Sequence, residues 1–271
     1  MSPGTDRSPV VPALRSARAV VFDTDGVLTD SARVHAAAWK DAFDAYLDAL
    51  PPGTANAPAR RPFDAAEEYR RYVDGRSRRD GAEAFLAARG LPAGPAVVEA
   101  VTADKERRFT ERLRARPVDA YPGSVLLVRA LRGAGVPMAA ASASRHAREL
   151  LEGAGLLGLF DAVVDGVESA RLGLPGKPDP ALFLEAARRL GVPAGECALV
   201  EDALAGVEAG RRGRFGLVVG VDRSPDTGPG TGTDTGPGAG TGPADALRRH
   251  GADLVVRDLA ELLAVREVQP S

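Results

Sequence analysis

Two aspartates follow the first apolar run of the sequence, residues 17–22. Asp23 and Asp25 are separated by one residue, and Gly26 comes next and permits a sharp turn. Two carboxylates this close repel each other unless a cation lies between them or one is protonated. Mg²⁺ prefers carboxylate oxygens, especially where a substrate phosphate completes its coordination. The motif therefore indicates metal-assisted phosphate chemistry, and an Asp-Gly turn with solvated acids is the alternative interpretation.

A second apolar run, residues 136–141, ends in hydroxyl groups and a guanidinium. Ser142, Ser144 and Arg145 follow this run, where a helix is expected to begin. The N–H groups of a helix N-terminus, together with a nearby cationic side chain, favour an anion such as phosphate. These residues therefore suit an anion-binding loop, and an ordinary helix N-cap is the alternative.

Lys177 and a second acidic pair complete the set of candidate residues. Lys177 lies in a Pro-Gly-Lys-Pro turn and is one of three lysines among 35 basic residues. A lysine in a chain that otherwise uses arginine indicates a need for a compact ammonium, and a surface position is the alternative. Glu201 and Asp202 follow the apolar run 197–200, where paired acids are costly to bury without a cation or hydrogen-bond donors.

These residues can act together only if the fold brings the ends of the apolar runs to one place. Six strand-sized runs alternate with amphipathic stretches, which predicts an α/β fold. We expect a doubly wound, Rossmann-like parallel sheet with helices on both faces, whose carboxyl edge binds ligands. The predicted strands are 17–22, 136–141, 162–164, 197–200, 215–221 and 252–256, and the predicted core helices are 124–134, 147–154, 181–190, 203–211 and 244–250.

The segment from residue 31 to 117 contains only helical patterning. Its first helix carries a buried stripe of aromatic and leucine side chains between Trp39 and Leu50. An insertion after the first strand lies over the carboxyl edge of the sheet. We therefore expect a helical cap domain at 31–117, inserted into a core made of 17–30 and 118–271. Further helices of the cap are predicted over 64–73, 79–88 and 93–116.

Two segments lack the pattern of packed structure. Residues 1–16 contain Pro, Ser and Gly with little periodicity, and we expect them to form a disordered tail. Residues 223–243 are a low-complexity run of Gly, Pro and Thr that cannot bury apolar surface, which predicts a surface loop in the core.

Composition and charge exclude several classes of protein. Of the 271 residues, 44% are hydrophobic and 27% are charged, as in soluble globular proteins, and the net charge of −2 gives no basic field for nucleic acid. No apolar run approaches a membrane span, and no secretory signal is recognisable. The single cysteine, Cys197, excludes an internal disulfide and suits a reducing compartment. We expect a cytoplasmic monomer with no nucleic-acid or membrane partner.

The order of the motifs resembles that of a known superfamily. Asp23-Thr24-Asp25-Gly26, Ser142, Lys177 and Glu201-Asp202 match, in order, the four motifs of the haloacid dehalogenase superfamily of phosphoryl-transfer enzymes. The helical insertion is similar to the cap of that superfamily. A closer resemblance, to the β-phosphoglucomutase branch, covers roughly residues 18–221 and rests on 23–30, His35, Trp39, 74–78, Lys105, 121–123, 141–144 and 176–178.

Besides a small change at Thr24, which replaces the usual apolar residue between the aspartates, two positions depart from the pattern of that branch. Arg145 stands where the branch usually has lysine, and His146 stands where it usually has asparagine. Both departures concern the recognition of the phosphate and the sugar ring, whereas the four core motifs are intact.

The resemblance implies a role for each motif residue. Asp23 would be the nucleophile that forms an aspartyl phosphate, and Asp25 would be the general acid and base for the sugar oxygen. Ser142 would hold the phosphoryl oxygens, and Lys177 would neutralise charge and link Asp23 to the phosphate. The implied Mg²⁺ site consists of Asp23, Asp25, Glu201 and Asp202, with Glu201 either a ligand or a support for one. The implied binding residues for a small-molecule sugar phosphate are His35, Gly75, Arg76, Arg78, Lys105, Ser144 and Arg145.

The leading expectation is a Mg²⁺-dependent enzyme of the β-phosphoglucomutase branch, which interconverts β-D-glucose 1-phosphate and glucose 6-phosphate. A sugar-phosphate phosphatase is the alternative, in which the same aspartyl phosphate is transferred to water. A phospho-accepting signalling module and a non-catalytic binding protein are candidates from other classes. Asp25 and the helical insertion argue against the signalling module, and the intact motifs argue against the binding protein.

Overall fold

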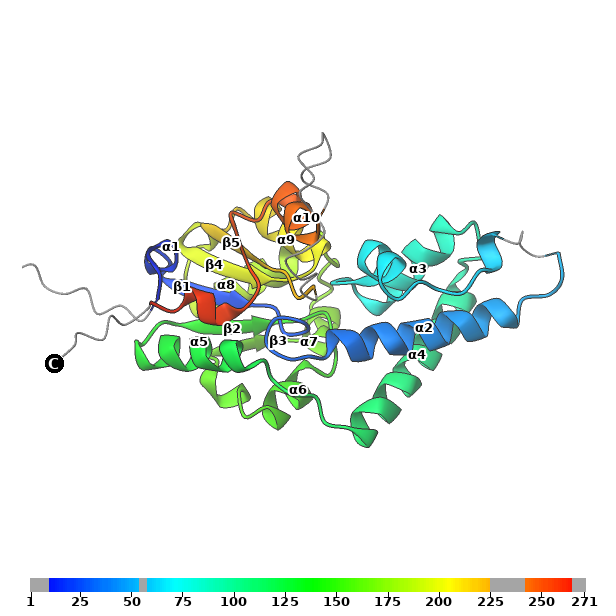
Figure 1. The fold of residues 1–271 in the computed structure, drawn as a ribbon, viewed down its shortest axis with the longest axis horizontal. Coiled ribbons are helices and arrows are strands. Elements are labelled where there is room, and N and C mark those ends of the chain that lie inside the picture. Colours follow the sequence, from blue (N-terminus) through cyan, green and yellow to red (C-terminus); the bar gives the residue numbers. More distant parts are fainter. Residues whose placement is uncertain (1–9, 54–57, 225–241, 265–271) are drawn as a thin grey trace, which may run out of the picture.

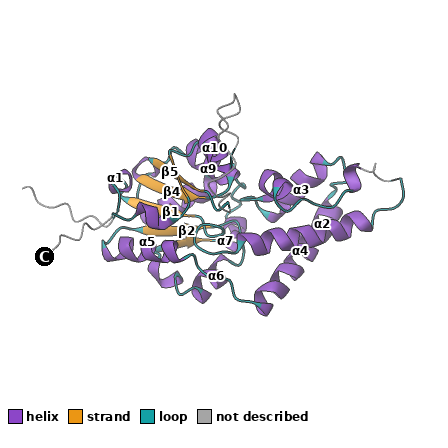
Figure 2. Ribbon diagram, in the orientation of Figure 1, coloured by secondary structure: helices purple, strands orange, loops and turns teal. Residues whose placement is uncertain are grey.

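Six parallel strands form the central sheet of the protein, in a computed structural model that describes residues 10–53, 58–224 and 242–264 (Figure 1). The strands are β1 (Ala19–Phe22), β2 (Met138–Ala141), β3 (Ala162–Val164), β4 (Cys197–Glu201), β5 (Leu217–Val221) and β6 (Leu254–Val256). Their order is β3-β2-β1-β4-β5-β6, so the chain starts near the centre and winds outward to both edges. The predicted doubly wound, Rossmann-like α/β fold is therefore confirmed (Figure 2).

Helices cover both faces of the sheet because the central strand β1 is apolar on both sides. Val20 and Phe22 belong to one buried cluster, and Ala19 and Val21 belong to the other, since successive side chains of a strand point to opposite faces. The first face packs against α5 (Pro122–Gly133) and α6 (Ala147–Gly153), and the second against α8 (Ala181–Leu190), α9 (Leu204–Arg212) and α10 (Pro243–His250). The shorter helices of this part are α7 (Gly166–Arg171), η3 (Leu157–Leu159), η4 (Ala194–Glu196) and η5 (Leu259–Leu262). The sheet and these helices are called the core lobe below.

Residues between β1 and α5 form a second lobe, which extends beyond the sheet (Figure 1). This helical lobe consists of α2 (Ala32–Asp48), η1 (Pro58–Arg60), η2 (Tyr69–Val73), α3 (Arg78–Ala88) and α4 (Pro95–Ala115). It has a hydrophobic cluster of its own, in which the rings of Phe63 and Phe85 lie 4.9 Å and 4.1 Å from that of Phe43. None of the described helices, including the 21-residue α4, is long and apolar enough to cross a membrane.

The segment predicted as a helix over 64–73 forms a wider helical turn. The N–H of Asp74 donates to the carbonyl of Tyr69 at 2.9 Å, five residues back, instead of the four of an α-helix. The side chain of Asp64 accepts the N–H groups of Ala66 and Glu67 and starts this turn. The wide turn leads directly into the loop that reaches the core lobe.

The prediction of a disordered tail through residue 16 is wrong for residues 10–16. α1 (Pro12–Arg15) packs on the core lobe, and Val10 and Leu14 are buried there. Val10 also pairs with Leu263 in an antiparallel bridge. Both side chains belong to the same buried cluster as Leu259 and Leu262 of η5, which explains why so short a segment is held. Residues 1–9, and most of the low-complexity segment 223–243, lie outside the described residues.

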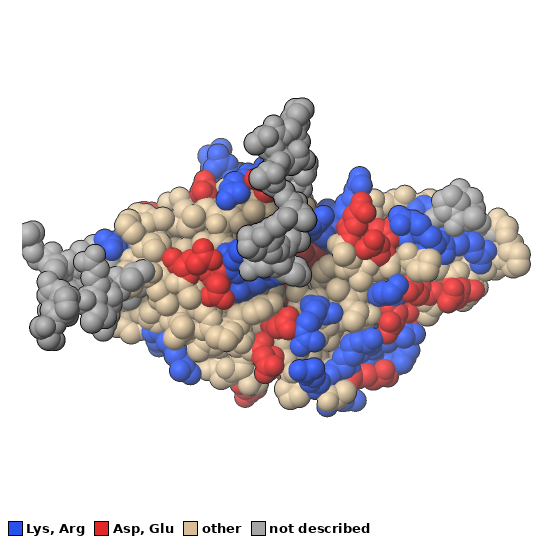
Figure 3. Space-filling model, in the orientation of Figure 1, with Lys and Arg blue, Asp and Glu red and all other residues tan. Residues whose placement is uncertain are grey.

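Charged side chains of both signs are interspersed over the helical lobe (Figure 3). On α4, Arg107 contacts Asp104 and Glu111, and Arg112 contacts Asp41 of α2. This pattern is typical of a solvated helix surface with many weak ion pairs. The face shown in Figure 3 therefore has no large patch of one charge sign over this lobe.

Candidate active site

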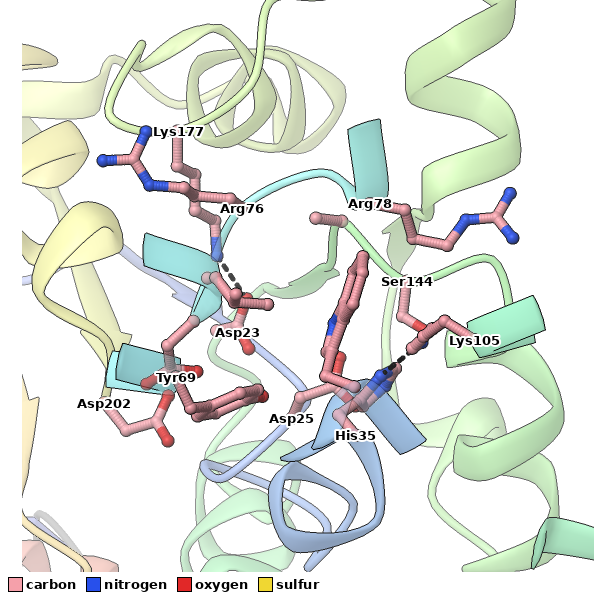
Figure 4. Close-up of a pocket in the computed structure, with 15 residues that line it drawn as sticks. Asp23, Asp25, His35, Tyr69, Arg76, Arg78, Lys105, Ser144, Lys177 and Asp202 are labelled. Atoms are coloured by element: carbon pink, nitrogen blue, oxygen red, sulfur yellow. Dashed lines mark hydrogen bonds and ion pairs between the residues drawn. The ribbon is translucent and has the colours of Figure 1, made fainter. Parts of the chain in front are cut away.

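The carboxyl ends of β1 and β4 and the facing side of the helical lobe enclose one pocket (Figure 4). The polar side chains predicted at the two strand ends meet there, because the strands are parallel and adjacent. The pocket lies where open α/β sheets bind ligands. Its lining consists of Asp23, Asp25, His35, Trp39, Tyr69, Val73, Asp74, Gly75, Arg76, Arg78, Lys105, Ala143, Ser144, Lys177 and Asp202.

Asp23 is buried and shares the ammonium of Lys177 with Glu201. Lys177 Nζ donates to Asp23 Oδ1 at 2.6 Å and to Glu201 Oε1 at 2.7 Å. Burial raises the pKa of Asp23 to about 7, and the charge of Lys177 opposes that rise. Burial alone would lower the pKa of Lys177, but Asp23 and Glu201 outweigh it and hold this pKa above its usual range. Lys177 is thus a fixed positive charge against the predicted nucleophile.

Asp25 has a different environment, two residues away. Ser142 Oγ donates to Asp25 Oδ2 at 3.1 Å, and Ser31 Oγ donates to Asp25 Oδ1. His35 Nε2 lies 3.4 Å from Asp25 Oδ1. Burial alone would raise the pKa of Asp25, but His35 and the two hydroxyl donors outweigh it and hold this pKa well below its usual range. The two aspartates therefore differ in environment: an ammonium holds Asp23, whereas hydroxyl groups and His35 surround Asp25.

Gly26 permits the turn that brings these acids against Asp202. Its φ is +79°, and a Cβ atom at this position would collide with the carboxylate of Asp202. A side chain is thus excluded both by backbone strain and by close approach. The Asp-Gly motif therefore allows the loop after β1 to pack against the end of β4, and it is not a solvated turn.

Three carboxylates at this place could hold a metal ion. Asp23, Glu201 and Asp202 each offer an oxygen, and these oxygens lie within 4.8 Å of one another. Burial raises the pKa of Asp202 well above its usual range, and the nearby acids add to the rise. A divalent cation with a preference for oxygen would relieve this repulsion, so the donor set fits Mg²⁺.

Glu201 and Asp25, two of the four predicted metal ligands, accept hydrogen bonds from groups of the protein. Both carboxylate oxygens of Glu201 accept hydrogen bonds, one from Lys177 and one from the backbone N–H of Ala203. The side chain of Asp25 lies outside the group of three oxygens described above, and its oxygens accept from Ser31 and Ser142.

The helical lobe contributes a buried cation beside Asp25. Lys105 Nζ lies 2.9 Å from His35 Nδ1 and 4.4 Å from the centre of the Phe109 ring. Burial lowers the pKa of Lys105 to about 8, and it also lowers the pKa of His35. Figure 4 shows Lys105 and His35 together at the side of the pocket opposite Lys177.

At Gly75 the helical lobe lies directly against the core lobe within this pocket. Its φ is +71°, and a Cβ atom would lie 2.8 Å from the Cβ of Ala203 and 3.8 Å from Cδ of Lys177. Arg76 follows and also lines the pocket. The predicted binding residues Gly75 and Arg76 are thus brought to the predicted catalytic ones.

The structure separates two of the predicted residues from the pocket interior. Arg145 is exposed and is not part of the pocket lining. Ser142 is buried behind Asp25, where its Oγ accepts the N–H of Ser144 at 3.0 Å. Ser144 itself lines the pocket.

Sequence reasoning gave no role to Tyr69, or to Asp74 although Asp74 begins the stretch 74–78 on which the resemblance rests, and both residues line the pocket. Burial raises the pKa of Asp74 to about 7, and the charge of Asp23 adds to the rise. The position of Asp74 directly before Gly75 is the signal that could have found it. Tyr69 gives no such signal, because an isolated aromatic residue in a helical stretch is typical of a core position.

Comparisons with known proteins agree with these features. A family model described as haloacid dehalogenase-like hydrolase matches residues 17–214. The chain is 41% identical over 266 residues to a protein of Mycobacterium bovis named beta-phosphoglucomutase, and the match covers 95% of each chain. It is 32% identical over 212 residues to the beta-phosphoglucomutase of Bacillus subtilis, covering 75% of this chain and 83% of that one.

Solved structures show the same fold. The crystal structure of a hydrolase from Pseudomonas syringae matches with a TM-score of 0.68 and 25% identity, covering 90% of this chain and 95% of that one. The resemblance found in the motifs, both to the superfamily and to its β-phosphoglucomutase branch, is confirmed, and so is the expectation of an enzyme. On the matched family model and the 41% identical relative, the protein belongs to the haloacid dehalogenase-like hydrolase family.

Proposed function

We propose that the protein is a Mg²⁺-dependent phosphoryl-transfer enzyme that interconverts β-D-glucose 1-phosphate and glucose 6-phosphate through a phosphate carried on Asp23. The observation that carries this proposal is the placement of Asp23 in one pocket with Asp25, against the ammonium of Lys177 and beside the carboxylates of Glu201 and Asp202. The 41% identity to a protein named beta-phosphoglucomutase supports the choice of reaction.

Asp23 is the proposed nucleophile. A carboxylate attacks a phosphate dianion poorly because the two charges repel, and the ammonium of Lys177, 2.6 Å from Asp23, offsets that repulsion. When Asp23 Oδ2 bonds to phosphorus, the bond between phosphorus and the sugar oxygen breaks. A bound Mg²⁺, held by Asp23 and Asp202 with Glu201 beside them, would supply further positive charge to the transferred group.

Asp25 is the proposed general acid and base. With phosphate on Asp23, the ionised Asp25 accepts the proton of a sugar hydroxyl, whose oxygen then bonds to phosphorus and releases Asp23. In the reverse step Asp25 returns the proton to the departing sugar oxygen. Its hydrogen bonds to Ser31 and Ser142 hold the carboxylate in place for both steps.

The rest of the pocket is suited to the sugar and its second phosphate. Arg78, Lys105 and Ser144 form its far end, away from Asp23, and are the proposed contacts for the phosphate that is not transferred. The helical lobe acts as a cap that excludes water, so that a sugar hydroxyl rather than water receives the phosphoryl group. Arg145 is omitted from this set because its side chain is exposed outside the pocket.

A sugar-phosphate phosphatase is the second candidate, and the match to a solved hydrolase favours it. The two functions share Asp23 and Asp25 and differ only in the acceptor of the phosphoryl group. The product identifies the acceptor: glucose 6-phosphate for a mutase, orthophosphate for a phosphatase.

The deciding experiment supplies the enzyme with β-D-glucose 1-phosphate, a catalytic amount of glucose bisphosphate and Mg²⁺, and measures both products. We expect glucose 6-phosphate in large excess over orthophosphate, and no turnover after Mg²⁺ is removed with EDTA. Asp23→Asn should abolish turnover with the fold retained. Asp30→Asn is the matched control, because Asp30 ends the same loop but pairs with Arg33 outside the pocket. Turnover that survives Asp23→Asn would refute the proposal.

A further inference from the structure

One carboxylate ties the helical lobe to the core lobe at the rim of the pocket. Glu106 of α4 lies 2.6 Å from Nη1 of Arg78 on α3, and 2.7 Å from Nε2 of His146, which directly precedes α6 of the core lobe. The three side chains are mostly shielded from water, with 28% of Glu106, 27% of Arg78 and 17% of His146 exposed. Contacts in so shielded a position are weakened less by water than ordinary surface ion pairs.

This cluster lies directly behind the far end of the pocket. Arg78 lines the pocket, as does Lys105, which precedes Glu106 in α4. The N–H of His146 donates to Oγ of Ser144, another lining residue, at 3.2 Å. Figure 4 shows the Arg78 guanidinium turned away from Asp23, and the contact with Glu106 accounts for that orientation.

Glu106 is a negatively charged residue surrounded by the cationic or protonatable side chains of this cluster. Burial alone would raise its pKa, but His146, Arg78 and Lys105 outweigh burial and lower the pKa to about 2. The hydrogen bond with Glu106 in turn raises the pKa of His146. Glu106 is thus an anion held among cationic groups that also face the proposed position of the second phosphate.

We propose that in the ligand-free enzyme the carboxylate of Glu106 pairs with the Arg78 guanidinium, which is the binding group for the non-transferred phosphate. A bound sugar phosphate then displaces Glu106 from Arg78. This inference rests on the proposed function, because it presupposes a sugar phosphate in the pocket. Glu106 is a positioning residue: it presents Arg78 from one lobe and, through His146, joins that lobe to the other. An asparagine at position 146, usual in the β-phosphoglucomutase branch, could not supply the cationic partner.

The proposal predicts that loss of the Glu106 charge increases the affinity for a sugar phosphate, because this charge competes with the ligand for Arg78. Glucose 6-phosphate is titrated by calorimetry into the enzyme in excess EDTA, so that no phosphoryl transfer occurs. Glu106→Gln should lower its dissociation constant about two- to fivefold, the range expected from a partly exposed ion pair. Binding that is unchanged or weaker in Glu106→Gln would overturn the inference, since a merely structural contact gives that result.

Glu149→Gln is the matched control. Glu149 lies 3.0 Å from the other nitrogen of His146, but its side chain is 69% exposed and its helix belongs to the core lobe. We expect its substitution to leave the affinity for glucose 6-phosphate unchanged. An equal gain in Glu149→Gln would show a general effect of charge and would contradict a specific role of Glu106.

A second variant identifies Arg78 as the contested group. In an Arg78→Gln background, Glu106→Gln should no longer strengthen binding, because the cation for which phosphate and carboxylate compete is gone. A gain that persists in this background would refute the exchange. If the unsubstituted enzyme binds glucose 6-phosphate neither in EDTA nor with Mg²⁺ present, the proposed function fails. If the unsubstituted enzyme binds and Glu106→Gln binds more weakly, only the role given to Glu106 fails. Thermal melting of each variant verifies that it is folded.

Discussion

Lys177 donates a 2.6 Å hydrogen bond to Asp23, although 154 positions separate the two residues in the chain. Their side chains are 1% and 6% exposed, so water cannot replace either partner. A buried charge that loses its partner is strongly destabilising, whereas the intact pair contributes little net stability. The same contact is therefore expected to matter for both the fold and the chemistry.

Lys177→Met should lower the free energy of unfolding by about 3–5 kcal/mol, because Asp23 and Glu201 both lose their buried cation. Turnover should be lost as well, since no ammonium then offsets the charge of the phosphate. Urea unfolding and the product assay measure the two effects. Lys40→Met is the control: Lys40 pairs with Asp44 in a partly exposed position, and its loss should cost at most about 1 kcal/mol. Equal costs for the two variants would contradict the buried-pair argument.

The pKa of Asp23 predicts how pH affects the metal-free protein. Burial raises this pKa from 3.8 to about 7 in the folded state, so the folded protein binds a proton that the unfolded chain has already lost. The contribution of Asp23 to the free energy of unfolding therefore decreases as pH rises from about 4 to about 7. Mg²⁺ needs the ionised carboxylate and should reverse this loss.

Mg²⁺ binding should consequently release protons below about pH 7, and its apparent affinity should rise between about pH 6 and pH 8. Calorimetry in two buffers of different ionisation enthalpy measures the proton release. Thermal melting should show a larger stabilisation by Mg²⁺ at about pH 8 than at about pH 6. An affinity that does not change with pH would show that the carboxylates are already ionised in the metal-free protein.

The strands and the residues at their ends could be predicted from the sequence for a physical reason. A strand of a parallel sheet is buried on both faces, so β1 and β4 appear as short continuous apolar runs. The first polar residue after such a run then marks the carboxyl edge. Asp23, Ser142 and Asp202 were found in this way, and all three come directly after a strand.

Contacts between the lobes could not be predicted in the same way. Glu106 lies in an amphipathic stretch, where charged residues usually face solvent, and His146, 40 positions away, directly precedes another such stretch. Which charged residues contact one another depends on how the two lobes dock, and a local sequence pattern does not predict that docking. Val10 and Leu14 were missed for a related reason, because two apolar residues are too few to show a periodicity.

A buried ion pair in the helical lobe should be important for its stability. Arg89 donates to both oxygens of Glu68, at 2.8 Å and 2.6 Å, and to the carbonyl of Arg61 at 2.6 Å. Arg89→Ala should therefore lower the free energy of unfolding by about 3–5 kcal/mol. Hydrogen exchange should show the first loss of protection in α3, where Arg89 is the C-cap. Arg107→Ala, which removes an exposed residue of α4 with two acidic partners, should cost at most about 1 kcal/mol.

The close approach of Gly75 to Ala203 should make the docking of the two lobes sensitive to a single methyl group. Gly75→Ala places a Cβ atom 2.8 Å from that of Ala203, so the loop must move away from Ala203 and displace the neighbouring residues that line the pocket. We expect kcat to fall at least about tenfold, since small displacements at a reacting centre are costly. Gly90→Ala separates this effect from backbone strain, because Gly90 has a similar φ of +64° but no atom within 4 Å of the added Cβ. Both variants should lose about 1 kcal/mol of stability from the positive φ, and only Gly75→Ala should lose turnover. If Gly90→Ala loses as much turnover as Gly75→Ala, strain rather than contact between the lobes is the cause.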